Sequence, residues 1–229
     1  MNSLDMLTDM LLLQQRLNDE TNGIGWESGY TKDGKLINFR RCIYMECAEL
    51  VDSFSWKHWK NIDKKPDWKN IHIEIVDIWH FILSLILEEY KKKNTSNKAT
   101  IAIDINSVSV FRDFCGDTHS PKDSDIYDIL NDIELIIHKC SGLEFNVLEL
   151  FNAYFLLSIK CGINLEKLYK LYIGKNVLNK FRQDNGYKDG SYIKIWNGKE
   201  DNEVLNELLD KNGNFDYLYE NLEKIYRSL

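Results

Sequence analysis

The sequence contains little proline, no CxxC cysteine pair and no charge-free apolar segment long enough to span a membrane. Two prolines among 229 residues leave room for long uninterrupted helices. Five isolated cysteines without a CxxC pair argue against a zinc site and against a secreted disulfide framework. The first ten residues lack the cationic and apolar regions of a signal peptide. The longest apolar run, residues 71–87, carries acidic side chains and is a poor membrane span. We therefore expect a cytoplasmic protein without a membrane segment.

An excess of positive charge is also missing. The chain has 36 acidic and 29 basic residues and a net charge of −7, which disfavours binding to a nucleic-acid polymer as its main role. Basic side chains nevertheless concentrate in residues 170–199, where seven lysines and arginines stand against two aspartates. An acidic protein with a basic C-terminal segment can hold a cation and an anion in one place.

Apolar residues recur at helical spacing over most of the chain, and no group of segments shows the alternation of strands. This pattern predicts an all-α fold, a helical bundle. The expected helices cover residues 3–20, 38–57, 68–92, 99–114, 124–140, 146–161 and 164–182, followed by one or two terminal helices; the β-branched residues of 100–110 leave a strand open there. Glycine-rich residues 22–36 predict a long loop or lid, and residues 183–203 a functional loop. We expect one domain over residues 1–229, in which residues 94–160 are a candidate semi-independent, mobile subdomain beside a rigid core.

The segment IHIEIVDIWHFILSLIL, residues 71–87, is apolar around almost its whole circumference. Glu74, Asp77 and His80 interrupt it at three-residue intervals, and with Ser84 they fall within an arc of about 120° on a helix. A helix with so narrow a polar face is typical of a buried element. Buried carboxylates are costly unless they are paired, protonated or bound to a cation.

A second pair of acids has the same spacing on the preceding apolar segment, CIYMECAELVDSF. Glu46 and Glu49 stand three residues apart there, so two buried helices can each bring two carboxylates to one place. Four carboxylates on converging helices predict a central site for hard divalent cations, most plausibly Mg²⁺. The competing interpretation is a structural carboxylate network neutralised by basic residues such as Arg40 and Arg41.

Five segments together resemble one family of enzymes. An ExxE motif followed by ExxD resembles the metal signature of the all-α nucleoside triphosphate pyrophosphatases. The wider segments resemble one branch, the dimeric dUTPases. They are LQQRLN (13–18), MECAELVDSFSWKHWKN (45–61), IEIVDIWHF (73–81), IGKNVLNKFRQDNGYKDGSYIK (173–194) and WNGKEDN (196–202). They cover about a third of the chain in the family's order, while residues 94–160 carry no motif.

The resemblance implies Mg²⁺-dependent hydrolysis of dUTP, and of dUDP, to dUMP by a homodimer. It makes metal ligands of four carboxylates, whose oxygens hold Mg²⁺ ions that bridge the phosphates and polarise an attacking water. These are Glu46, Glu49, Glu74 and Asp77. Glu49 is the first candidate for the base that orients or deprotonates the water.

The resemblance also assigns the residues that hold the nucleoside. Gln14 and Asn18 stand four residues apart on a helix, so their amides share a face; alone they read as two exposed amides, but the resemblance assigns them to uracil. It further implies that Trp56 closes the uracil pocket, that His80 hydrogen-bonds near the sugar, and that Phe81 packs against the deoxyribose. A lone histidine on a buried helix is more often a core residue, yet His80 shares the polar arc of the acids.

Basic and polar side chains near the C-terminus suit a polyphosphate. Lys175, Asn179 and Arg182 share one helical face, and Tyr187, Lys188 and Lys194 lie in the glycine-containing loop beyond. The resemblance assigns Lys175, Arg182, Tyr187 and Lys194 to the phosphates and Asn179 to the sugar. A Walker-type GxxxxGK[ST] loop is absent from the sequence.

Two alternatives remain open at this point. One is a related all-α pyrophosphatase that acts on dCTP or on noncognate nucleotides. The other is a regulatory role through binding to another protein, because some members of this branch are engaged by regulatory proteins.

Overall fold

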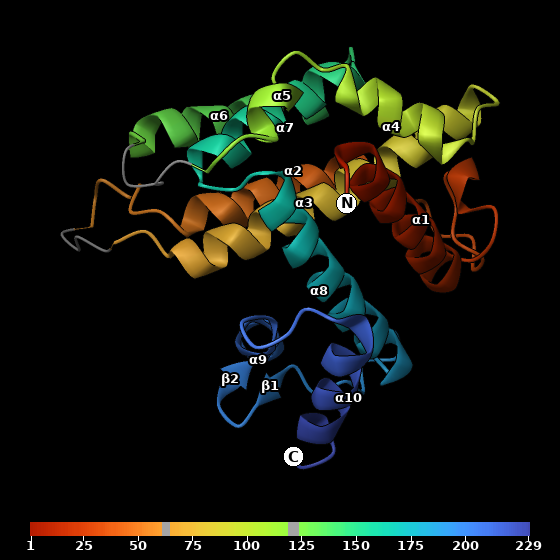
Figure 1. The fold of residues 1–229 in the computed structure, drawn as a ribbon, viewed down its shortest axis with the longest axis vertical. Coiled ribbons are helices and arrows are strands. Elements are labelled where there is room, and N and C mark those ends of the chain that lie inside the picture. Colours follow the sequence, from red (N-terminus) through yellow and green to blue (C-terminus); the bar gives the residue numbers. More distant parts are fainter. Residues whose placement is uncertain (61–64, 119–123) are drawn as a thin grey trace.

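The computed structural model describes residues 1–60, 65–118 and 124–229, and nearly all of their regular secondary structure is helical (Figure 1). The elements run α1 (Ser3–Asn22), the 3₁₀ turn η1 (Trp26–Ser28), α2 (Phe39–Asp52), α3 (Trp68–Lys92), α4 (Lys98–Asn106), α5 (Phe111–Phe114), α6 (Ile126–Ser141), α7 (Val147–Lys160), α8 (Leu165–Asp184), β1 (Ile195–Trp196), β2 (Lys199–Glu200), α9 (Asp201–Leu209) and α10 (Phe215–Tyr226). The predicted all-α fold is confirmed.

Asparagine and aspartate side chains fix where most of these helices begin. Each accepts a hydrogen bond from a backbone N–H of the first helical turn, which would otherwise lack a partner. The capping residues are Asn2, Asn38, Asp67, Asn97, Asp125, Asn146, Asn164 and Asn214. The starts of α1, α2, α3 and α8 are thereby set by local sequence, and these four helices carry most of the predicted site residues.

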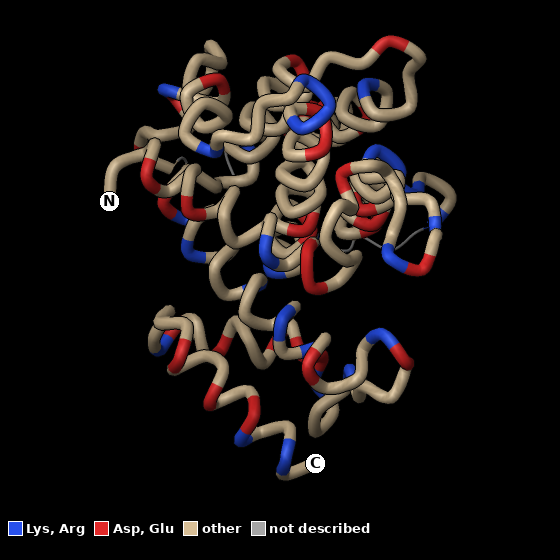
Figure 2. Tube along the Cα trace, turned by 90° about the vertical axis from the view of Figure 1, so that its right-hand side faces the viewer, with Lys and Arg blue, Asp and Glu red and all other residues tan. Residues whose placement is uncertain are grey.

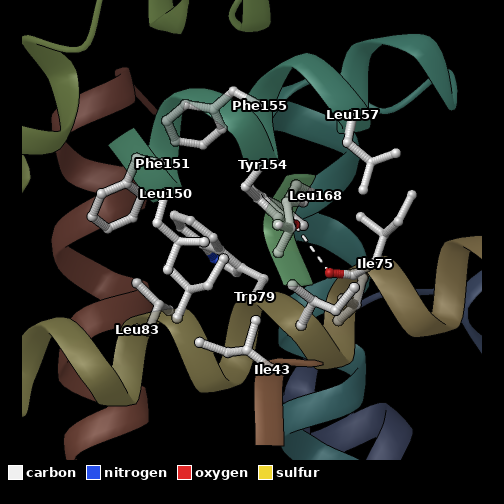
Figure 3. Close-up of a cluster of buried hydrophobic side chains, with 14 of the residues drawn as sticks. Ile43, Ile75, Trp79, Leu83, Leu150, Phe151, Tyr154, Phe155, Leu157 and Leu168 are labelled. Carbon is white, nitrogen blue, oxygen red and sulfur yellow. Dashed lines mark hydrogen bonds between the residues drawn. The ribbon is translucent and has the colours of Figure 1, made fainter. Parts of the chain in front are cut away.

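Helix α3 lies at the centre of the fold and packs against α1, α2, α7 and α8 (Figure 1). On one side its Trp79 stacks on Tyr154 of α7 with ring centroids 5.1 Å apart, and the Tyr154 hydroxyl donates to the Ile75 carbonyl at 3.0 Å (Figure 3). By length and composition α3 could cross a membrane, yet 72% of its most apolar stretch is buried in the fold. Such burial is typical of the core helix of a globular protein.

Helix α8 joins two apolar cores. Its first half belongs to a large core that also takes in α1–α3 and the buried side chains of α4–α7. Its second half packs with β1, α9 and α10 in a smaller core, which includes Phe181, Trp196, Leu205 and Leu218. In Figure 1 this smaller core lies below the other helices, around the C-terminal half of α8. The buried residues of segment 94–160 thus share the large core, and the separate subdomain suggested for that segment stays a prediction.

Helix α2 is shorter than expected, because the prediction extended it to residue 57. It ends at Asp52, where the chain turns to meet the start of α3. The Ser53 carbonyl accepts from the Asp67 N–H at 3.0 Å, and the Ser53 hydroxyl accepts from the Asn70 amide at 2.9 Å. These two bonds tie the end of α2 to the beginning of α3 and stop the helix five residues early.

The expected helix 99–114 is interrupted. Helix α4 ends at Asn106, and the Ser107 hydroxyl donates to the Asp104 carbonyl at 2.7 Å, which competes with continued helix formation. A short α5 follows at Phe111. The strand left open by the β-branched residues does not form.

Residues 183–203, which were predicted to form a loop, contain two short strands and the start of a helix. Ile195–Trp196 and Lys199–Glu200 form an antiparallel hairpin closed by Asn197 and Gly198. Both turn residues have positive φ, 51° and 83°, the signature of a tight hairpin turn that Asn-Gly favours. Helix α9 starts directly after β2 at Asp201. The Asn-Gly pair was a signal in the sequence that the loop prediction overlooked.

Candidate active site

Three of the four predicted carboxylates converge between α2 and α3. Ligand oxygens of Glu46, Glu74 and Asp77 lie within 4.8 Å of one another. Glu74 is buried and Glu46 and Asp77 are half-buried, whereas Glu49 is exposed and lies outside this group, so the expectation that all four acids are buried is wrong for Glu49. The apolar stripe of α2, which includes Ile43, faces the core and turns Glu49 toward solvent. Three convergent carboxylates form a hard-oxygen donor set that fits a divalent cation.

Burial and the close approach of these acids raise the pKa of two of them. Burial, and then the charges of neighbouring acids, raise the pKa of Glu46 to about 8 and that of Glu74 to about 7. Lys175 Nζ on α8 lies 2.8 Å from Asp77 Oδ2 and partly offsets the negative charge. Without a metal, the cluster therefore holds a proton near neutral pH.

The basic side chain beside the carboxylate cluster is neither Arg40 nor Arg41, the two residues of the competing interpretation. Arg40 instead donates to the carbonyls of Cys140 and Gly142. Arg41 is exposed. The neutralising residue is Lys175, 98 positions beyond Asp77, and it also donates to the Asn202 side chain at 2.9 Å.

Arg182, one turn of α8 from Asn179, is held by a buried partner. Its Nε and one terminal nitrogen each donate to Asp201 at 2.8 Å in a two-pronged ion pair. The Tyr192 hydroxyl donates to the same carboxylate at 2.7 Å. Burial acts to raise the pKa of Asp201, but the bonds and charge of Arg182 outweigh it and lower that pKa. The guanidinium is therefore fixed in direction by a charged anchor.

At the other end of the site, uncharged side chains form a buried network between α1 and α3. The amide nitrogens of Gln14 and Asn18 each lie 2.9 Å from Ser84 Oγ. His80 Nδ1 lies 2.8 Å from Gln14 Oε1, and the Tyr172 hydroxyl donates to the same oxygen at 3.0 Å. All five side chains are buried, so each polar atom in this network is placed by its partners.

The protonation of His80 follows from this network. An amide oxygen only accepts, so Nδ1 carries the proton that it shares with Gln14, and Nε2 is left as an acceptor. Nε2 is buried and has no hydrogen-bond partner among the described residues. Burial, and then the charge of Lys175, lower the pKa of His80 to about 3, so the ring is neutral at physiological pH.

One cleft of about 520 Å³ connects these two ends. Its volume suits a small-molecule ligand. It is lined by ten of the fifteen predicted site residues, namely Gln14, Asn18, Glu46, Asp77, His80, Phe81, Lys175, Asn179, Arg182 and Tyr187. Phe81 forms part of one wall and packs on Phe39, with ring centroids 6.4 Å apart. Glu74 joins the site through the carboxylate cluster.

Besides Glu49 and Glu74, three predicted residues lie outside the lining of the cleft. Trp56 follows the early end of α2, is partly exposed, and donates to Asp52 at 3.1 Å. Lys188 and Lys194 are exposed. Lys188 pairs with Asp33 at 3.2 Å, and Lys194 pairs with a nearby glutamate. Their assignments to substrate stay predictions.

The basic C-terminal segment is largely neutralised by ion pairs. Six of its seven cations lie within 4 Å of an acidic oxygen; besides Lys175, Arg182, Lys188 and Lys194 these are Lys180 and Lys199. Figure 2 shows acidic and basic positions interspersed along the trace in both parts of the molecule. Of these seven cations, Lys175 and Arg182 line the cleft, so an anion bound there would meet these two ion-paired side chains.

Sequence reasoning missed several partners of the site residues. Tyr172, Asp201 and Asn202 received no role, and Ser84 was noted only for its place on the polar arc. Asp201 and Asn202 lie in the WNGKEDN segment. Asp201 is fully buried, but nothing in this charged stretch of sequence distinguishes it from an exposed acid. Tyr172 carried a weak signal, since it shares a helical face with Lys175 and Asn179.

A family model described as dUTPase matches residues 6–187, more than three quarters of the chain. The matched span includes the carboxylate cluster, the amide network and both cleft cations. It ends before Asp201 and the Asn-Gly hairpin. No curated protein matches the chain.

Proposed function

Since the chain belongs to the dUTPase family and is a dUTP diphosphatase, we propose that it hydrolyses dUTP and dUDP to dUMP with Mg²⁺ in this cleft. The observation that carries the proposal is the continuity of the site. A single cleft is lined at one end by amides that suit a base and at the other by acids and cations that suit a metal and phosphates.

The donor set fits Mg²⁺. Three carboxylates within 4.8 Å of one another, two of them with a raised pKa, are groups that a divalent cation would stabilise in the charged form. When bound, Mg²⁺ would polarise phosphate oxygens and lower the pKa of a nearby water. Glu46, Glu74 and Asp77 would hold it, and the exposed Glu49 is proposed as the fourth acid and as the base.

At the charged end, the protein would bind the phosphates through two buried cations. The Asp201 carboxylate aims the Arg182 guanidinium, whose planar fork suits two phosphate oxygens. Lys175 lies beside the acids and would place an ammonium group where the phosphates meet the carboxylate cluster. Tyr187, whose ring lies 5.6 Å from the Arg182 guanidinium carbon, would close over the chain of phosphates. Lys188 and Lys194 are proposed to reach the phosphates from the loop.

At the neutral end, Gln14 and Asn18 would bind the uracil edge. His80 presents Nε2 as an acceptor, and a sugar hydroxyl is a donor that would satisfy it. Phe81 supplies an apolar wall for the deoxyribose, and Asn179 lies on the facing helix. Trp56 is proposed to close the base pocket, although its side chain lies outside the lining of the cleft.

We further propose that the protein is a homodimer of the cytoplasm. The resemblance to dimeric enzymes supports this assembly. Light scattering coupled to size exclusion would test it directly, because a mass near the 27.0 kDa of one chain would contradict the dimer.

The decisive assay measures products from dUTP, dUDP, dCTP, dTTP and UTP with Mg²⁺ or with EDTA. We expect dUMP and pyrophosphate from dUTP, dUMP and phosphate from dUDP, and no turnover in EDTA. Preference for dCTP would favour the alternative pyrophosphatase activity. Absence of turnover on dUTP with Mg²⁺ present would refute the proposal.

A further inference from the structure

We propose that Ser84 sets the choice between uracil and cytosine by fixing the direction of the Asn18 and Gln14 side-chain amides. This inference rests on the proposed function and deepens it. Ser84 is fully buried on α3, lies behind both amides, and is not part of the cleft lining. It would therefore act as a positioning residue, through the two residues that face the base.

The direction of every bond at Ser84 is determined. Its hydroxyl donates to the carbonyl of His80, one turn earlier in α3, at 2.9 Å. The hydroxyl proton is used in that bond, so the oxygen can only accept from the side chains around it. Gln14 and Asn18 must each point an amide N–H at Ser84, since their carbonyl oxygens would meet a lone pair instead.

The pinned amides present a fixed pattern to the cleft. The Gln14 oxygen accepts from His80 and shares the Tyr172 hydroxyl proton with the Met10 carbonyl, so this amide offers the base its second N–H. Asn18 turns its oxygen away from Ser84, with the Asn22 amide 3.5 Å from it, and offers an acceptor beside a second N–H. The two residues together present one acceptor and two donors.

Uracil and cytosine differ in which positions of the base donate hydrogen bonds and which accept them. Uracil carries an N3–H donor flanked by two carbonyl acceptors, which complements an acceptor flanked by N–H groups. Cytosine keeps the 2-carbonyl but carries an acceptor at N3 and a donor at the 4-position, so it requires the reverse at these two positions. Rotating the Asn18 amide by 180° exchanges its donor and acceptor and would make that match. Ser84 opposes the rotation, because a flipped Asn18 would place its oxygen against a hydroxyl oxygen that has no proton to give.

The chain offers a matched control. Ser158 on α7 is also fully buried, and its hydroxyl donates to the Tyr154 carbonyl one turn earlier at 2.8 Å. Ser158→Ala therefore removes the same kind of hydroxyl and back-bond without touching an amide of the cleft. The readout is the ratio of kcat/KM for dUTP to kcat/KM for dCTP, which a loss of stability alone does not change.

We expect Ser84→Ala to lower this ratio by about tenfold or more, through a gain on dCTP as well as a loss on dUTP. Ser84→Cys, which keeps nearly the same volume but accepts hydrogen bonds weakly, is expected to lower it in the same direction. Ser158→Ala should leave the ratio within about twofold of wild type. In an Asn18→Ala background, Ser84→Ala should add little further change, because the amide it acts on is gone.

A ratio that stays within about twofold of wild type in Ser84→Ala, or in Ser84→Cys where the alanine variant does not fold, overturns the inference. So does an equal loss in Ser158→Ala. These outcomes leave the proposed function standing, since wild type still cleaves dUTP. Failure of the wild-type enzyme to turn over dUTP is a separate result, which refutes the proposed function itself.

Discussion

The two ends of the cleft are built from different interactions. At the neutral end, Gln14, Asn18, His80 and Ser84 hydrogen-bond to one another without charge, and the directions of these bonds are set before any ligand binds. At the charged end, the acids are satisfied only in part, by Lys175 and by retained protons. The neutral end therefore suits recognition of one fixed shape, whereas the charged end must change its protonation when a cation arrives.

The largest expected effect comes from the charged end. Asp77→Asn removes one proposed metal oxygen and the partner of Lys175, so turnover of dUTP should fall by about 100-fold or more. Product formation at saturating Mg²⁺ measures this, with circular dichroism to confirm that the helices persist. Activity within about tenfold of wild type would remove Asp77 from the metal site.

The next largest effect is expected on stability, when Asp201, the partner of Arg182, is changed. Asp201→Asn leaves a buried guanidinium without its anionic partner, which should lower the free energy of unfolding by about 3 kcal/mol. Urea denaturation followed by helical circular dichroism measures the change. The exposed pair of Lys199 and Glu207, 2.5 Å apart, provides the control, and Glu207→Gln should leave the unfolding midpoint unchanged. Equal midpoints for the two variants would show that Asp201 is not an anchor.

The pH dependence of stability should separate the two ends. The pKa of Glu46 is raised to about 8 and that of Glu74 to about 7, so the protonated forms stabilise the folded, metal-free protein. This contribution is complete below about pH 4.5 and is lost as the pH rises through 7 and 8. At the neutral end the pKa of His80 is lowered to about 3, so the unfolded chain takes up a proton below about pH 6.5 that the folded protein does not bind. This contribution has the opposite sign, because it raises stability as the pH rises to about 6.5, and it adds no slope above about pH 7.

We therefore expect the Tm of the metal-free protein to fall by several degrees between about pH 7 and about pH 8.5, and Mg²⁺ to reverse the fall at the alkaline end. Differential scanning calorimetry with EDTA and with Mg²⁺ measures both. Glu46→Gln should flatten the metal-free profile. A Tm that rises with pH over this range in EDTA would contradict the assigned protonation of the cluster.

The smallest effect is expected within the neutral network. Tyr172→Phe removes the hydroxyl that donates to Gln14 but leaves the bonds of that amide to Ser84 and His80. Stability should fall by about 1 kcal/mol and KM for dUTP should rise by about two- to fivefold with kcat unchanged. A loss of kcat as large as that of Asp77→Asn would mean that the two ends are not separable.

Sequence periodicity predicted what lies on one helix better than what meets across helices. Glu74, Asp77, His80 and Ser84 share an arc of α3 because the helical repeat alone places them there. The pairing of Lys175 with Asp77 could not be predicted, since it depends on how α8 crosses α3. The exposure of Glu49 depends likewise on which face of α2 meets the core.

Local signals explain the remaining differences. The Asn-Gly pair at 197–198 predicts a tight turn, and the structure has a β-hairpin there where a long loop was expected. The end of α2 at Asp52 has no comparable signal, because it depends on hydrogen bonds from Ser53 to the start of α3. Trp56 consequently lies beyond the helix, outside the described lining of the cleft.

We propose that one cleft divides into a neutral end that selects the base and a charged end that binds metal and phosphates. Calorimetric titration of deoxyuridine and of a non-hydrolysable dUTP analogue, each with and without Mg²⁺, distinguishes the two ends. We expect Mg²⁺ to tighten binding of the triphosphate analogue by at least about tenfold and to change that of deoxyuridine by less than about twofold. An equal effect of Mg²⁺ on both ligands, or no effect on the triphosphate, would contradict this proposal.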